Sequence, residues 1–382
     1  MLFRSCPNAA FVNGTACHGL DFDDGFTLGS VHPSGAVFPA IMAIAERDQC
    51  PVSDVIAAGA AAYDVTTRIA ATMHPSSARR GFHNTPVAGV IGAAAGVARL
   101  LKLDAKTTLD AMGLAGSFAG GLREYLFGGA EVKRVHPGKA ARDGVTCAEL
   151  AKRGLTGPEQ VLEGRNGIFN AMAAGEVHWG RMCDGLGERF EIGNVYFKPY
   201  PACRHFHAAL DSVREMRVKH NISPRDVARI EVGLYEVGAR GHDHRHANSL
   251  LDAQMSAPVS TALAMVYGAV TVNTYDPAKI NDPEVQRILA VTSAGVDAEC
   301  ERVYPKRRSG VARVTLLNGQ SFELRVLDPK GEAENPMTDE DLTHKFQSNC
   351  EAILGTAKCD RVLALVWSIE KAASLKELYS AE

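Results

Sequence analysis

Long apolar segments separated by short polar stretches dominate the first half of the chain. Apolar positions recur there with the spacing of buried helices, and cap signals flank the segments, such as Ser53-Asp54 before the first and Gly154 after the last. The segments with this spacing are residues 55–73, 86–101, 105–118 and 138–153. The pattern predicts an all-helical unit over about residues 1–195.

The pattern changes after residue 200, where alternating apolar and polar residues appear. Residues 227–235 alternate like a half-buried strand, and residues 313–326 form two alternating stretches around Asn318-Gly319. Because Asn-Gly tolerates positive φ at both positions, the second stretch predicts a β-hairpin closed by a type I′ turn. Helices are predicted between the strands, at residues 207–219, 257–267 and 282–292.

Helical spacing returns near the C-terminus, over residues 338–350 and 360–378. Thr338 followed by acidic residues is typical of a helix start, because acids favour the positive end of the helix dipole. A helical tail after an α+β segment suggests that the tail packs back on the first unit. We therefore predict a mainly α protein, with a large all-helical domain of residues 1–198 and 331–382 and a smaller α+β lid domain of residues 199–330 inserted before the C-terminal helices.

Composition excludes several classes of protein. The 382 residues carry a formal net charge of −3, so a nucleic-acid partner is not expected. The longest strongly apolar stretch, residues 86–98, is too short to span a bilayer, and the N-terminus lacks the apolar core of a signal peptide. Nine cysteines without a CxxC pair argue against a disulfide framework or a zinc ribbon. We predict a cytoplasmic protein with no membrane partner.

Carboxylates and histidines cluster near the N-terminus. Asp21, Asp23 and Asp24 lie between His18 and His32. Carboxylates orient imidazoles and fix their tautomers in many acid/base sites. The segment is compatible with a general acid/base site, with a metal site, or with an acidic helix end followed by a turn.

Two further segments place imidazoles and cations at predicted helix starts. His83 precedes the helix of residues 86–101, where the positive helix end depresses an imidazole pKa and favours a proton acceptor. Lys133, Arg134 and His136 precede the helix of residues 138–153, where free N–H groups attract anions. A small di- or tricarboxylate is the natural ligand of such a cluster. The structural alternatives are a histidine in a surface loop and a solvated basic turn.

A proline-stiffened segment lies at the predicted domain boundary. It presents Lys198, Cys203 and Arg204 in a fixed geometry, and ligand sites favour such boundaries. No Cys–His nucleophile motif is recognisable around Cys203, so a catalytic thiol is the less favoured interpretation. His242, His244 and His246 have metal-binding spacing, but no matching cysteine or carboxylate is evident in the sequence, and we predict no metal.

Four motifs together carry a resemblance to a known family. The motifs are DFDD with HPSG, then GFHNTPV, then KRVHPGKAARDG and finally FKPYPACRHFHAALDS. In this order they resemble the motifs of the MmgE/PrpD family, and the resemblance extends over nearly the whole chain. The resemblance implies a homodimer without a required metal or organic cofactor, acting on small polycarboxylates at a site between its domains. The residues that we assign to catalysis are Asp21, His32, His83 and Lys133. Those assigned to substrate binding are Arg134, His136, Lys198, Cys203 and Arg204.

The family's reactions share a carbanion-like state next to a carboxylate, which cations stabilise. Lys133, Lys198 and Arg204 are predicted to bind substrate carboxylates, His83 or His32 to abstract the proton, and Asp21 to orient a histidine or to donate a proton from a raised pKa. A hydro-lyase of the 2-methylcitrate dehydratase type is the leading prediction. An epimerase of a dicarboxylate and a non-catalytic polycarboxylate-binding protein are the alternatives.

The chain also departs from the family. The decarboxylase members have Thr, His and Tyr where this chain has Gly25, Cys203 and Met255. These three differences predict that decarboxylation of cis-aconitate is not its reaction. Relatives carry more helices before the first motif, so the helical domain is expected to be short at its N-terminus and to expose a face that relatives cover. That face predicts either tighter dimerisation or poor stability of the isolated protein.

Overall fold

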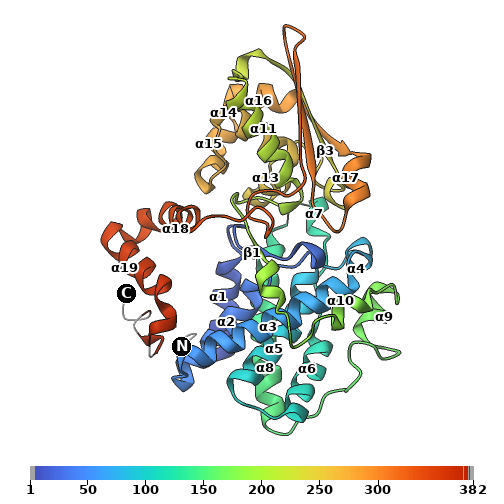
Figure 1. The fold of residues 1–382 in the computed structure, drawn as a ribbon, viewed down its shortest axis with the longest axis vertical. Coiled ribbons are helices and arrows are strands. Elements are labelled where there is room, and N and C mark those ends of the chain that lie inside the picture. The colour runs from blue at the N-terminus through green and yellow to red at the C-terminus, as the bar shows by residue number, and fades with distance from the viewer. Residues whose placement is uncertain (1–4, 129, 373, 377, 379–382) are drawn as a thin grey trace.

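The computed structural model describes residues 5–128, 130–372, 374–376 and 378. It is mainly α with a smaller α+β portion, as predicted. Figure 1 shows two units along the long axis of the molecule, a helical unit at the bottom and an α+β unit at the top, with the last helices at the side. Each unit has its own large cluster of buried apolar residues.

The helical unit is built around three helices that contain many small residues. Its helices are α1 (Cys6–Cys17), α2 (Ser34–Asp48), α3 (Val52–Met73), α4 (Ser76–Arg79), α5 (Asn84–Leu100), α6 (Ala105–Phe118), α7 (Tyr125–Gly128), α8 (Val135–Lys152), α9 (Ile168–Ala173) and α10 (Trp179–Cys183). Helix α5 is buried almost throughout and lies against α3 and α8. The approach is close, because a Cβ at Gly92 would lie 1.8 Å from Thr66 Oγ1. The four predicted helices are confirmed, but α3 starts at Val52 rather than after Ser53-Asp54.

The α+β unit holds a four-stranded sheet in the order β4-β3-β5-β6. The strands are β3 (Val227–Leu234), β4 (Thr292–Val296), β5 (Gly310–Leu316) and β6 (Ser321–Val326). The helices of this unit are α11 (His207–Lys219), α12 (Glu236–Ala239), α13 (Leu250–Met255), α14 (Ala257–Tyr267), α15 (Pro277–Ile280), α16 (Pro283–Ala290) and α17 (Ala298–Val303). Strand β3 pairs parallel with β4 and antiparallel with β5. The strand and helices predicted for this region are present.

The β5–β6 hairpin forms at the predicted place, but its turn type differs from the prediction. Gly319 has a positive φ of 86°, whereas Asn318 does not, so the turn is not type I′. Gly319 N donates to Leu316 O at 3.0 Å, and the Asn318 side chain accepts from Gln320 N at 2.9 Å. These bonds make a longer loop in which one glycine in the left-handed region reverses the chain.

A two-residue ribbon lies where the units meet. Strand β1 (Asp24–Gly25) pairs antiparallel with β2 (Tyr196–Phe197), so residues 1–195 are not entirely helical. A Cβ at Gly25 would lie 2.2 Å from the Tyr196 hydroxyl oxygen. Glycine at this position is therefore required by the tyrosine ring beside it. The ribbon fixes the loop of residues 18–25 against the segment that leads into the α+β unit.

The C-terminal helices return to the helical unit. Helix α18 (Asp339–Leu354) begins with the expected capping box of Thr338 and Asp341, and α19 (Thr356–Trp367) ends well before the predicted residue 378. Lys345 Nζ donates to the carbonyl oxygens of Phe22 and Lys198 at 2.7 and 2.9 Å. Leu375 joins the apolar cluster of the helical unit. Among the described residues, none of the helices combines the length and apolarity that crossing a bilayer requires.

Candidate active site

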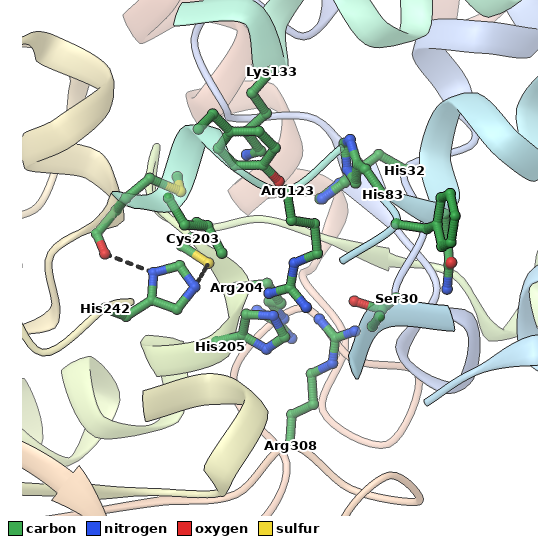
Figure 2. Close-up of a pocket in the computed structure, with 16 residues that line it drawn as sticks. Ser30, His32, His83, Arg123, Lys133, Cys203, Arg204, His205, His242 and Arg308 are labelled. Carbon is green, nitrogen blue, oxygen red and sulfur yellow. Dashed lines mark hydrogen bonds between the residues drawn. The ribbon is translucent and has the colours of Figure 1, made fainter. Parts of the chain in front are cut away.

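A pocket lies between the two units (Figure 2). The helical unit and its loops contribute Ser30, His32, His83, Asn84, Arg123, Tyr125 and Lys133, among others. The α+β unit contributes Cys203, Arg204, His205, His242, Met255 and Arg308. The cavity volume of this pocket is ≈ 40 Å³. The pocket therefore brings together side chains from segments nearly 300 residues apart, and half of them are cations or imidazoles.

Asp21 forms the centre of a buried ion cluster. Lys133 Nζ donates to Asp21 Oδ1, and Lys198 Nζ lies 3.0 Å from the same oxygen. Burial alone would raise the pKa of Asp21, but Lys133 and Lys198 outweigh it and hold this pKa well below its ordinary value. Asp21 is therefore a carboxylate. Its predicted role as a proton donor with a raised pKa is wrong, because two lysines stabilise the charged form.

His32 is held in one tautomer by its surroundings. Its Nδ1 lies 2.6 Å from the backbone oxygen of Asp24, and its backbone N–H donates to Thr85 Oγ1 at 3.0 Å. Because a carbonyl oxygen only accepts hydrogen bonds, Nδ1 carries the proton and Nε2 of the neutral ring has the free electron pair. Burial, with Lys198 and Lys133 nearby, holds the pKa of His32 well below its ordinary value, although Asp23 favours the charged form. His32 is a neutral proton acceptor at neutral pH.

His18 is a site residue that the sequence-based assignment left out. Its Nδ1 lies 2.6 Å from Asp23 Oδ2, and both side chains are almost fully buried. The His18 and His32 ring centroids are 5.0 Å apart. Asp23 is the nearer carboxylate to these histidines, whereas Asp21 Oδ1 lies 3.9 Å from His18 Nε2. The HxxDxDD spacing in the sequence contained this signal, because it brings His18 and Asp23 to the two ends of one short loop.

His83 caps the N-terminus of α5, as predicted, and contacts a second histidine. His83 Nδ1 lies 2.8 Å from His136 Nδ1, so one ring donates and the other accepts. Burial, then the neighbouring His136 and Lys133, keep the pKa of His83 well below its ordinary value. Burial lowers the pKa of His136 to about 4. His83 lines the pocket while His136 lies behind it, so His136 contacts the His83 ring and is not placed to touch a ligand directly.

Two arginines that the sequence analysis missed face the pocket. Arg123 reaches the centre of the view in Figure 2, with Arg308 beside it. Within the described part of the chain, neither guanidinium forms an ion pair, and that of Arg123 forms no hydrogen bond. Arg308 is 3% exposed and donates to Thr27 O at 3.2 Å. Uncompensated cations in a buried pocket favour an anionic ligand. The run Lys306-Arg307-Arg308 was a sequence signal for Arg308, and the sequence around Arg123 carried no comparable signal.

Three predicted substrate-binding cations have other partners. The Lys198 side chain is fully buried and is held by Asp21 and Asp23 outside the pocket. Arg134 pairs with Glu131 at 3.2 Å and does not line the pocket. Arg204 touches the pocket, but its guanidinium donates to Glu332 Oε1 at 2.9 Å and to Lys330 O at 2.9 Å. Lys133 also lines the pocket, although its ammonium group donates to Asp21 Oδ1.

We expect Arg204→Met to lower the free energy of unfolding by roughly 3–5 kcal/mol, because it leaves Glu332 buried as an unpaired charge. Arg204 and Glu332 are 2% and 6% exposed, and Arg204 also stacks 4.3 Å above the Tyr196 ring. Urea unfolding measures the change. The double variant Arg204→Met, Glu332→Gln is expected to recover part of the loss. Unchanged stability with a raised KM would instead support direct substrate binding.

Three groups of described side chains have donor atoms close enough to share a metal ion. They are His18 with Asp23 and His32, Cys203 with His205 and His242, and His244 with His246 and Asp252. The first two groups face Lys133, Lys198, Arg123 and Arg308, whose charges oppose a bound cation. The third is apart from the pocket. The H-x-H-x-H motif does not act as one unit, because His242 turns to Cys203 while His244 and His246 turn to Asp252.

Comparison with known proteins agrees with this architecture. The MmgE/PrpD N-terminal domain model matches residues 4–179, and the MmgE/PrpD C-terminal domain model matches residues 200–371. Together the two models cover the helical unit and the α+β unit that line the pocket. The chain belongs to the MmgE/PrpD family.

Among its relatives are proteins named cis-aconitate decarboxylase. The mouse protein is 28% identical over 98% of this chain and 78% of its own length. The human protein is 27% identical over 95% of this chain and 76% of its own length. The Aspergillus terreus protein is 24% identical over 97% of this chain and 80% of its own length. Dehydration is the leading prediction from the sequence, so the named activity of these relatives is the main competing reaction.

Proposed function

We propose that this protein is a lyase that acts on a small di- or tricarboxylate through a carbanion-like state next to a carboxylate. The observation that carries the proposal is one pocket that holds the cations Lys133, Arg123 and Arg308 together with the neutral imidazole of His32. Cations lower the energy of charge that develops beside a carboxylate, and a neutral imidazole accepts the proton. Both requirements of the chemistry meet within one buried site.

Dehydration of a citrate-like hydroxy acid is the leading reaction. The cations bind the substrate carboxylates, and His32 Nε2 takes the proton from the carbon next to one of them. The electron pair left on carbon forms a C=C bond as the C–O bond of the neighbouring carbon breaks, and the hydroxyl group leaves as water. Decarboxylation is the second candidate, favoured by the names of the relatives, and it needs the same cations.

The α+β unit acts as a lid in this proposal. A cavity of ≈ 40 Å³ is far smaller than the ~300–1,000 Å³ of typical ligand pockets, so a tricarboxylate needs the units to separate before it binds. Closure over the substrate then removes water and strengthens each charge interaction. The fold supplies two large clusters of buried residues, one mainly in each unit, which suits such a movement.

An NMR screen of citrate, methylcitrate, aconitate and amino-dicarboxylates in deuterated water tests the proposal. We expect one hydroxy acid to yield an alkene, because proton removal and loss of hydroxide share the site. Release of carbon dioxide from aconitate would favour decarboxylation. Deuterium in recovered substrate without an alkene would favour epimerisation. Binding of citrate in calorimetry with no conversion of any compound would contradict the proposal.

A further inference from the structure

Cys203 and His242 form a buried thiol–imidazole pair in the wall of the pocket. Cys203 Sγ lies 3.6 Å from His242 Nε2, and His242 Nδ1 lies 2.7 Å from the backbone oxygen of Met255. Since the carbonyl only accepts, His242 Nδ1 carries a proton and Nε2 accepts from the thiol. Cys203 is 8% exposed and His242 is fully buried. The pair is therefore ordered by one backbone contact and opens only toward the pocket.

The pair lies across the pocket from the proposed base. In Figure 2, Cys203 and His242 are on one side of Arg123, and His32 and His83 are on the other. A ligand bound to the cations between them would have a proton acceptor on one face and a thiol on the other. We propose that Cys203, positioned by His242, is a second proton-transfer residue of this site, acting on the substrate face opposite His32.

This inference rests on the proposed function and adds the proton donor that dehydration needs. His32 Nε2 takes the proton from carbon, the C–H electron pair becomes the π bond, and the C–O bond breaks. The leaving hydroxide takes the Cys203 proton and departs as water. Cys203 is then a thiolate, and His32 is an imidazolium that holds the proton from carbon. Proton return from His32 to Cys203 through solvent restores both groups, so the net change is substrate to alkene and water.

The surroundings of the thiol suit this role. Burial alone would raise the pKa of Cys203, but His242 and Lys133 outweigh it and lower this pKa to about 7. A proton donor is most effective when its pKa is near the working pH. The titratable groups that face the thiol are His242, Lys133, Asp21, Tyr125, Tyr235 and Tyr275. Because the thiol must be protonated to act, turnover is expected to fall as pH rises through about 7.

Alkylation tests the pair without any substrate. The intact protein is treated with iodoacetamide from pH 5 to pH 10, and peptide mass spectrometry follows Cys203, with the exposed Cys183 as internal reference. We expect the Cys203 rate to rise with a midpoint near 7. In His242→Gln the Cys203 rate at pH 7 should fall about tenfold, as for an ordinary thiol. An alkylation rate of Cys203 that is unchanged in His242→Gln overturns the proposal. So does a wild-type protein that carries one mole of zinc per chain when Cys203→Ser carries none.

Turnover of the substrate found in the NMR screen tests the proton-transfer role. Cys203→Ser is expected to lower kcat about 10²-fold with little change in KM, and to abolish the fall of kcat above pH 7. Cys183→Ser is the matched control and should behave as wild type. Wild-type kcat in Cys203→Ser, or an unchanged alkaline limb, overturns this inference alone. A wild-type protein that converts no compound of the panel overturns the proposed function as well.

Discussion

His32→Asn is expected to lower kcat by about 10²–10⁴-fold, the contribution of a general base. Asn is the suitable substitution because its amide nitrogen can replace Nδ1 and donate to the Asp24 carbonyl, which lies 2.6 Å from Nδ1 in the wild type. The variant keeps this contact and removes only the Nε2 electron pair. Steady-state kinetics on the substrate found by NMR gives the result, and far-UV circular dichroism checks that the fold is intact.

The same histidine fixes the acid side of the pH profile. Because the pKa of His32 lies well below its ordinary value of about 6.5, the neutral form persists to lower pH, and kcat/KM should stay level from neutral pH down to about 6. His220→Gln, at a histidine that stacks on Phe322 far from the pocket, is the control. Wild-type kcat in His32→Asn would assign the base to another residue, and His83 would be the next to test.

Arg123→Gln is expected to lower kcat/KM by about 10²–10³-fold, because loss of a buried, hydrogen-bonded charge contact with a ligand costs about 2–5 kcal/mol. Arg123 lines the pocket and has no ion-pair partner within the described part of the chain, so its charge is available to a substrate carboxylate. Kinetics across the panel, together with calorimetric titration of citrate, separates binding from turnover. The loss should be larger for tricarboxylates than for dicarboxylates.

Arg123→Lys is the matched variant. It retains the charge but not the planar fork that binds a carboxylate through two N–H groups, so its activity should lie between those of wild type and Arg123→Gln. Stability should change little in either variant, since the guanidinium makes no hydrogen bond to any described residue. Wild-type kcat/KM in Arg123→Gln would show that Lys133 and Arg308 bind the carboxylates without it.

Several groups in the pocket followed from local sequence. His83 was placed at a helix start because Asn-Thr-Pro follows it, and that helix is α5. Lys133 precedes the predicted helix of residues 138–153, and it lies in the short 3₁₀ turn before α8. Such positions depend on helix limits, which the spacing of apolar residues and the cap residues determine over a few turns.

The roles of the cations did not follow from local sequence. Lys198 and Arg204 lie in a segment whose cations were predicted to bind substrate carboxylates. In the structure, Asp21 pairs with Lys198 and Glu332 pairs with Arg204. A buried cation is available to a ligand only if no carboxylate of the protein packs against it. Here the carboxylates that pair with Lys198 and Arg204 are 177 and 128 residues away in the sequence. Arg123 and Arg308 differ because, among the described residues, no carboxylate forms an ion pair with either.

By itself the sequence determined the helical and α+β units, the hairpin and the segments that carry the chemistry, because hydrophobic spacing and turn residues act over short distances. Only the tertiary structure decided the tautomer of His32, the pairing of Cys203 with His242 and the identity of the unpaired cations. These properties arise where two separately packed units meet. The protonation and pairing of each side chain between the units depend on its burial and on the nearest charge. Neither can be predicted from the residues that adjoin it in the sequence.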